Sequence, residues 1–258
     1  MIGLLLFSTF LGGVVFNASN ILLAAAVALC GMSVAFPVGV GLALVLGVLI
    51  NYFGAAKGDP LFIFLGVALI AAAIVMNGLA YRMARTGKWK LAAKGLLISV
   101  AAGTIMAFFY RFVASSMDLD SFTAPAAGKM TPYTAVVVFA TGVFVSNFLF
   151  NTIAMKCPVE GTPVRPSEYF GGTFRTHLVG MLGGAIWCLG ESFSMIASGK
   201  AGAAISYGLG QGATLVSALW GILIWKEFRG APGASVLCNA GMFVLFLAGL
   251  GLLIYAGA

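Results

Sequence analysis

The chain has 258 residues, of which 61% are hydrophobic and only 8% are charged, and its formal net charge is +7. Charged residues make up about a quarter of a soluble globular domain, so this composition excludes a soluble protein and predicts one that lies in a lipid bilayer. The positive charge falls in short loops, with no basic patch interleaved with aromatic residues, which excludes a nucleic-acid partner.

The apolar runs of the chain are long enough to cross a membrane. About 20 apolar residues span the hydrocarbon core as a helix, and on that measure the chain contains about eight spans. The two-residue alternation of a barrel strand is absent, and a helix pairs all its backbone groups internally. We therefore predict an all-α, polytopic membrane helix bundle with spans near residues 2–29, 33–53, 60–83, 91–116, 133–155, 174–198, 201–225 and 232–255.

The basic residues predict how these spans are oriented. Three loops hold most of the 14 lysines and arginines, namely Arg82, Arg85, Lys88, Lys90, Lys94, Lys156, Arg165, Arg175, Lys226 and Arg229. The opposite side of the membrane receives Lys57, Arg111, Lys129 and Lys200. By the positive-inside rule the three basic loops are cytoplasmic and both termini lie outside. We expect a multi-pass protein of the bacterial cytoplasmic (inner) membrane.

The two halves of the chain resemble each other. The segment from Ser33 to Phe53 resembles the segment from Ser206 to Phe228, and the segment from Gly13 to Asn20 resembles that from Gly184 to Glu191. This resemblance pairs the first two spans with the sixth and seventh, and an offset of five crossings turns one copy upside down. Inverted repeats of this kind are typical of transporters, whose solute site lies near the membrane midplane where the repeats meet. We predict an incomplete first repeat of about three helices at residues 1–86 and a second repeat of about five helices at residues 87–258.

Glu191 is the acid placed well inside a span, and a carboxylate there is costly unless it has a function. Hydrocarbon disfavours the charged form, so Glu191 is predicted to couple transport to protons; a protonated glutamate that only bonds a neighbouring helix is the structural alternative. Asn20 holds the matching position in the first repeat. Amides converging with a carboxyl group suit a polar solute, and the further candidates for binding it are Asn17, Asn147, Asn151, Gln211 and, by stacking, Trp187. For each amide the alternative is an interhelical hydrogen bond.

Glycine and proline interrupt the second and seventh spans at equivalent points. Proline removes a backbone donor, and glycine permits a close neighbour or a ligand. The residues predicted to break these helices or allow close approach are Pro37, Gly39, Gly41, Gly208, Gly210 and Gly212. Close packing alone is the other interpretation of these two motifs.

The remaining reactive side chains indicate neither a metal site nor an enzyme. The four cysteines have no metal-ligand spacing, and the single histidine, His177, lies near the start of a span. One buried acid and one histidine provide no nucleophile-base pair. We expect no metal, no cofactor and no catalytic residue.

Four segments carry a resemblance to a known family: Gly13 to Asn20, Ala35 to Gly41, Lys200 to Gly212 and Ala218 to Phe228. They resemble the glucose/ribose porter and ureide permease branch of the drug/metabolite transporter superfamily, and the run from Lys200 to Phe228 is the most specific part. The resemblance implies ten helices in two inverted five-helix repeats and the cation- or proton-coupled movement of a sugar or ureide. Counterparts of the first two helices are expected to be absent from this sequence, which then resembles a remnant of that architecture; a late start of the sequence, a natural truncation and a partner chain all remain open as the reason. Plant ureide permeases carry a nucleotide-binding-like motif in a longer central loop, which is absent here, so a bacterial-type sugar transporter is preferred.

The expected function is therefore secondary active transport of a small polar, sugar-like solute, with symport of a proton or another cation. The alternative within transport is a permease or exporter for a ureide, nucleobase or other metabolite. A different class remains open, in which the chain is a non-transporting remnant or assembly subunit that needs a partner for its missing helices. A homodimer is a further possible assembly.

Overall fold

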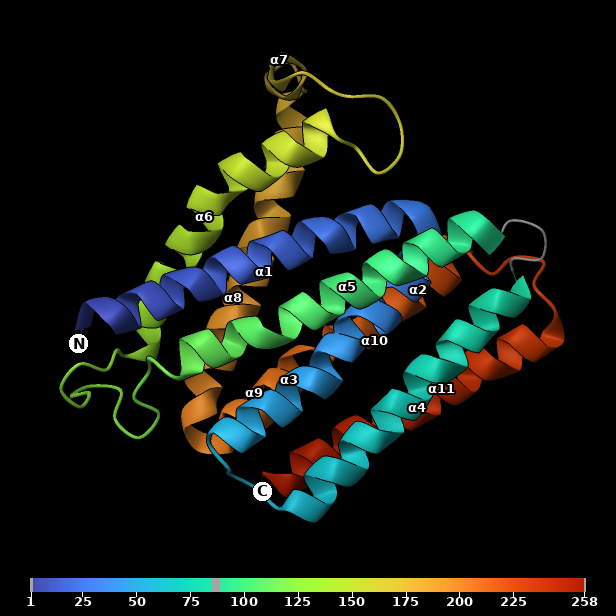
Figure 1. The fold of residues 1–258 in the computed structure, drawn as a ribbon. Coiled ribbons are helices and arrows are strands. Elements are labelled where there is room, and N and C mark those ends of the chain that lie inside the picture. The colour runs from blue at the N-terminus through green and yellow to red at the C-terminus, as the bar shows by residue number, and fades with distance from the viewer. Residues whose placement is uncertain (1, 85–88, 258) are drawn as a thin grey trace.

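The computed structural model describes residues 2–84 and 89–257. Within these ranges, eight helical segments are long and apolar enough to cross a membrane, and they run up and down as a bundle (Figure 1). The single-helix spans are α1 (Ile2–Cys30), α4 (Pro60–Ala84), α5 (Trp89–Ala114), α6 (Pro132–Lys156), α8 (Phe174–Ala201) and α11 (Gly233–Ala256). The predicted all-α polytopic bundle is confirmed, with bounds that differ from the expected ones by a few residues.

The second span is broken into three pieces, α2 (Met32–Ala35), the π-helical turn η1 (Phe36–Val40) and α3 (Gly41–Gly54). Pro37 is the second residue of η1, and proline cannot donate the backbone hydrogen bond that an α-helix needs. The widened turn brings its backbone against α5, where a Cβ added at Gly103 would lie 2.1 Å from the carbonyl oxygen of Gly39. A side chain at position 103 would therefore collide with the backbone of η1.

The seventh span is also interrupted. It consists of α9 (Ala203–Gly210), α10 (Ala213–Leu219) and the π-helical turn η2 (Trp220–Ile224). Between α9 and α10 the Gly212 N–H bonds to the carbonyl of Leu209, three residues back, at 2.9 Å. This tighter turn separates α9 from α10, while the Gln211 N–H still bonds to the carbonyl of Tyr207, four residues back, at 3.1 Å.

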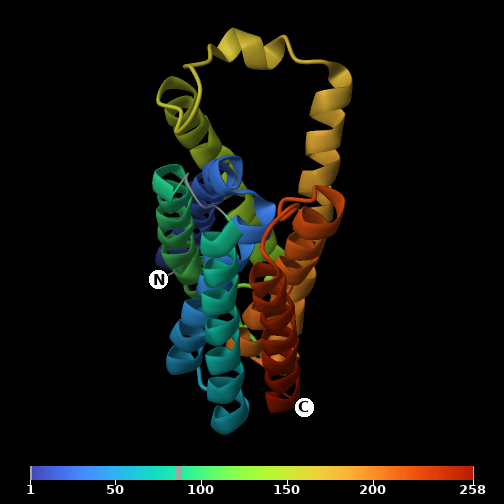
Figure 2. The same cartoon turned by 90° about the vertical axis from the view of Figure 1, so that its right-hand side faces the viewer.

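The most extensive helix packing occurs at two places in the bundle. Helices α4 and α11 lie side by side and antiparallel, while α1 packs against both α5 and α6 (Figures 1 and 2). Small residues allow this close approach, as expected for helices in lipid. A Cβ added at Gly13 of α1 would lie 2.2 Å from the carbonyl oxygen of Phe139 in α6. Phe16, Phe109 and Phe139 then fill the space between these three helices.

Two turns at opposite ends of the bundle have the same backbone shape. Gly31, between α1 and α2, has φ 84° and ψ 164°, and Gly202, between α8 and α9, has φ 84° and ψ 157°. Positive φ favours glycine at both places. Their separation along the chain equals that between Asn20 and Glu191. The inverted repeat itself stays a prediction, and its proposed boundary between residues 86 and 87 lies outside the described residues, as do the loop residues Arg85 and Lys88.

The loop that follows each broken span contacts the glycine turn of the other half of the chain. Glu227 accepts hydrogen bonds from the backbone N–H groups of Met32 and Ser33, at 3.0 and 2.9 Å, and from the Ser33 hydroxyl. At the other end, Lys57 Nζ donates to the carbonyl of Gly199 at 2.8 Å. An acid at a helix N-terminus and a base at a helix C-terminus both match the helix dipole. These contacts tie the two halves together at both ends.

One helix was not predicted from the sequence. The short helix α7 (Pro166–Phe170) lies in the loop between α6 and α8, which diverge toward it in Figure 2. It is exposed and has no apolar run, so the hydrophobicity of the chain gives no sign of it.

Candidate solute-binding site

A partly open cavity of about 470 Å³ lies between α8 and the helices of the first half, a size typical of small-molecule sites. It is bounded by α1, η1, α5, α8 and the turn between α9 and α10. Four of the side chains predicted to handle solute or protons meet there, Asn20, Trp187, Glu191 and Gln211, together with the predicted close-approach residue Gly210. The full lining is Phe16, Asn20, Leu23, Phe36, Val40, Met106, Ile186, Trp187, Gly190, Glu191, Gly210, Gln211, Ala213 and Thr214.

Glu191 lies near the middle of α8 and supplies the carboxyl group of this cavity. Its side chain is half-buried, and in the described part of the chain its Oε1 atom is buried without a hydrogen-bond partner. A buried polar atom without a partner costs free energy, about 1 to 3 kcal/mol and more when the group is charged. A bound proton or a solute N–H group is the kind of partner that removes this cost.

The aromatic wall of the cavity is formed by Trp187 and Phe16. Their rings stack with centroids 4.7 Å apart and an interplanar angle of 21°. Phe16 is held in turn by Phe109 of α5 and Phe139 of α6. Trp187 remains 40% exposed, so it presents a flat apolar surface next to the polar groups. A planar solute ring can stack on such a surface.

Hydrogen bonds just beyond the cavity fix the helices that carry its polar groups. Ser194, one turn after Glu191, donates to the carbonyl of Ser206 at 3.2 Å, and Ser206 donates back to the carbonyl of Ser194 at 2.5 Å. Tyr207 donates to the carbonyl of Ala43 in α3 at 3.1 Å. These bonds join α8 to α9 and α9 to the first half of the chain, so Glu191 and Gln211 are held in a defined relation.

The other predicted amides lie elsewhere. Asn17 is buried between α1 and α6, where its Nδ2 donates to the carbonyl of Val143 and to the Ser146 hydroxyl at 3.2 and 3.0 Å. Asn147 and Asn151 are exposed on α6. The structure thus places Asn17 in an interhelical hydrogen bond and does not bring these three amides to the cavity of Glu191.

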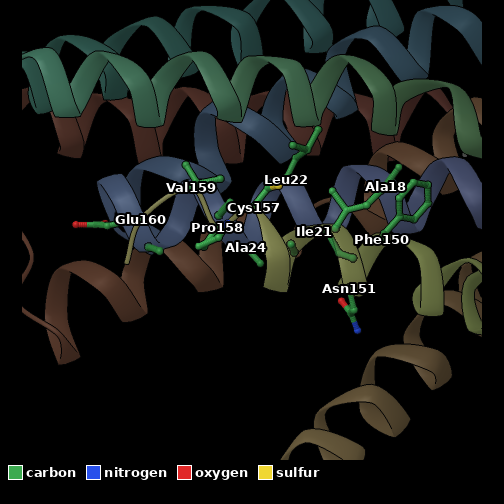
Figure 3. Close-up of a pocket in the computed structure, with 14 residues that line it drawn as sticks. Ala18, Ile21, Leu22, Ala24, Phe150, Asn151, Cys157, Pro158, Val159 and Glu160 are labelled. Carbon is green, nitrogen blue, oxygen red and sulfur yellow. The ribbon is translucent and has the colours of Figure 1, made fainter. Parts of the chain in front are cut away.

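A second cavity, of about 530 Å³, lies between α1 and the C-terminal half of α6 (Figure 3). Its wall is mostly apolar and rich in alanine, and its polar side chains are Asn151 and, at one end, Glu160. A polar solute would find few hydrogen-bond partners there, and burying its polar groups unpaired is unfavourable. The smaller cavity around Glu191 has the better chemistry for solute binding.

Outside the spans, Asp118 organises the loop that joins α5 and α6. Its carboxylate accepts backbone N–H bonds from Ala126 at 2.7 Å, Asp120 at 2.9 Å and Ser121 at 3.1 Å. These bonds favour the charged form and lower the pKa of this carboxyl group. Asp118 is therefore a structural acid of the loop. Among the described residues, no three histidine, cysteine or acidic side chains gather as metal ligands would.

Among the cavity residues that the sequence did not single out, Phe16 and Thr214 matter most for the chemistry of the site. Phe16 lies among many apolar residues, and nothing in the sequence separates a cavity-facing phenylalanine from a core one. Thr214 follows Gln211 by three residues, so it would have been found by extending the predicted helix break by one turn.

The comparisons with known proteins agree on one family. The model of the ureide permease family matches residues 86–256. Ureide permease 2 of Arabidopsis thaliana is 23% identical over 160 residues, which cover 62% of this chain and 40% of that protein. The chain thus matches less than half the length of this relative. No solved structure matches significantly.

Proposed function

Because the chain belongs to the ureide permease family, we propose that it carries a small planar metabolite of the ureide or nucleobase class across the membrane, with a proton carried by Glu191. The observation behind this proposal is the cavity lined together by Glu191, Gln211, Asn20 and the partly exposed ring of Trp187. Ureides and nucleobases present alternating N–H and C=O groups on the edge of a flat unit. A carboxylate accepts from such N–H groups, and a side-chain amide both donates and accepts.

The family match favours this alternative over the sugar preferred from the sequence. The amides, the carboxyl group and the tryptophan of the cavity suit a sugar as well as a ureide, so the residues alone do not separate the two. The motif by which plant ureide permeases differ belongs to the central loop, and none of the residues that the structure describes within 82–94 is among those that line the cavity. The absence of this motif therefore carries less weight than a match over residues 86–256.

The coupling role of Glu191 is supported by its place in the cavity. The solute and the proton would meet at the same group, because Oε1 has no partner within the described chain. A charged, unpaired carboxylate in a membrane interior is costly, and protonation removes the charge before the site changes its exposure. Alternating access would then follow from the predicted inverted repeat. The contacts of Glu227 and Lys57, which join the two halves at opposite ends of the bundle, would be the places where the halves move against each other.

A second possibility, that the chain works only with further helices, is favoured by α8. In the most apolar stretch of α1, 44% of the residues are buried inside the protein, against 6% in α8. Gly12 and Gly13 of α1 are in tight contact with α5 and α6, whereas Gly183 and Gly184, which hold the matching positions of α8, have open space around them. We propose that two more transmembrane helices pack on this face of α8, as α5 and α6 pack on α1.

Counterflow in proteoliposomes tests the solute class. Vesicles containing the protein are loaded with unlabelled solute, and entry of labelled allantoin, uracil, glucose and ribose is measured. We expect allantoin or uracil to exchange at least about tenfold faster than either sugar, equivalent to about 1.4 kcal/mol of selectivity. Faster exchange of glucose or ribose would restore the sugar interpretation. The absence of exchange for all four solutes would favour the assembly subunit.

A further inference from the structure

Thr214 is a buried side chain of the cavity for which the packing of the protein provides no partner. It is fully buried in α10, it lines the same cavity as Glu191 and Gln211, and its Oγ1 atom has no hydrogen-bond partner in the described part of the chain. Thr9 shares the last property, but it does not line the cavity. A buried hydroxyl group without a partner is unfavourable, so its presence beside a cavity needs an explanation.

The helix break explains why this hydroxyl group has no partner. A threonine inside a helix commonly bonds the carbonyl four residues earlier. Thr104, Thr141 and Thr152 do this here, with carbonyls of Val100, Val137 and Phe148. The corresponding carbonyl for Thr214 belongs to Gly210, where α9 ends, and the chain turns before α10 begins. The break therefore separates the Thr214 hydroxyl from its usual acceptor.

We propose that Thr214 is a solute-binding residue, whose hydroxyl group forms a hydrogen bond to a carbonyl or N–H group of the transported molecule. This assignment rests on the proposed function, because it takes the cavity as the solute site. The break of the seventh span then leaves the buried Thr214 hydroxyl group without its usual helical acceptor, at the wall of the cavity that Gln211 also lines.

The test uses three variants of the transporter in the counterflow assay with allantoin and uracil. Thr214→Val keeps the shape of the side chain and removes the hydroxyl group, Thr214→Ser retains it, and Thr152→Val removes a hydroxyl that has its own carbonyl partner. We expect Thr214→Val to raise KM about five- to tenfold with little change in kcat, since it removes a bond made to the bound solute. Thr214→Ser and Thr152→Val should stay within about twofold of the unmodified protein.

Thermal unfolding without solute distinguishes binding from a structural role. Removing an unpaired buried hydroxyl group should leave Thr214→Val as stable as the unmodified protein or more stable, while its KM rises. An unchanged KM in Thr214→Val, with active unmodified protein, would overturn the assignment of Thr214 alone. A fall in melting temperature without a change in KM would indicate a structural bond and also overturn it. If the unmodified protein shows no saturable exchange, the proposed function fails together with this assignment.

Discussion

Replacing Glu191 with glutamine is expected to abolish proton-driven accumulation of solute while exchange of solute down its own gradient continues. Glutamine keeps the size of the side chain and its ability to form hydrogen bonds, but it does not take up and release a proton. In vesicles with a pH gradient, accumulation of allantoin or uracil should fall at least about tenfold, to the level seen when the gradient is collapsed. Counterflow without a gradient should remain within a few-fold of the unmodified protein.

The matched control for this experiment is Glu160→Gln, the same change at an exposed loop residue. It should accumulate solute as the unmodified protein does. Full gradient-driven accumulation by Glu191→Gln would remove Glu191 from the coupling step. Loss of both accumulation and counterflow would assign Glu191 to solute binding without showing that it carries the proton.

Substituting alanine for Gly103 is expected to be among the most destabilising additions of a single methyl group to the protein. The new Cβ would lie 2.1 Å from the carbonyl oxygen of Gly39 and 2.9 Å from its carbonyl carbon, so two backbones must move apart. Overpacking of this kind costs about 1 to 3 kcal/mol and sometimes more, and backbone atoms yield less readily than side chains. We expect a cost of about 3 kcal/mol and a melting temperature lower by about 5 to 10 °C in detergent.

Gly251→Ala is the control, because Gly251 is a helical glycine of α11 with open space around it. That change should leave the melting temperature unchanged or raise it slightly, since alanine favours the helix. Because η1 carries Phe36 and Val40 into the cavity, Gly103→Ala should also raise the KM for solute. Equal melting temperatures for the two variants would show that η1 and α5 do not approach each other as described.

The spans were predictable because the length of an apolar run is set by the thickness of the membrane. Glu191 was identifiable for a related reason, since an acid in such a run is conspicuous. Pro37 and Gly212 marked where the second and seventh spans leave regular α-helix geometry, although the form of each break was not foreseen. Proline gives a widened turn in one span, and a tightened turn separates two helices in the other.

Other features depend on which neighbour each face of a helix meets, and an apolar helix does not reveal this. Asn17 and Asn20 lie one turn apart on α1, yet Asn17 bonds to α6 and Asn20 lines the cavity. Thr214 was missed because its hydroxyl group lacks a partner only as a result of the helix break at residues 211 and 212, which the structure reveals. The side chains of the cavity suit both a sugar and a ureide, so the sequence alone could not decide between these two solutes.

The central claim is that solute binds in the cavity around Glu191 and not in the larger one of Figure 3. Single cysteines placed at Gln211 and at Asn151, in a protein whose own four cysteines are replaced, report on the two cavities directly. We predict that saturating allantoin or uracil slows maleimide labelling at position 211 at least about threefold, as expected when bound solute covers the site, and leaves labelling at position 151 unchanged. Protection at position 151 with none at position 211 would contradict the account.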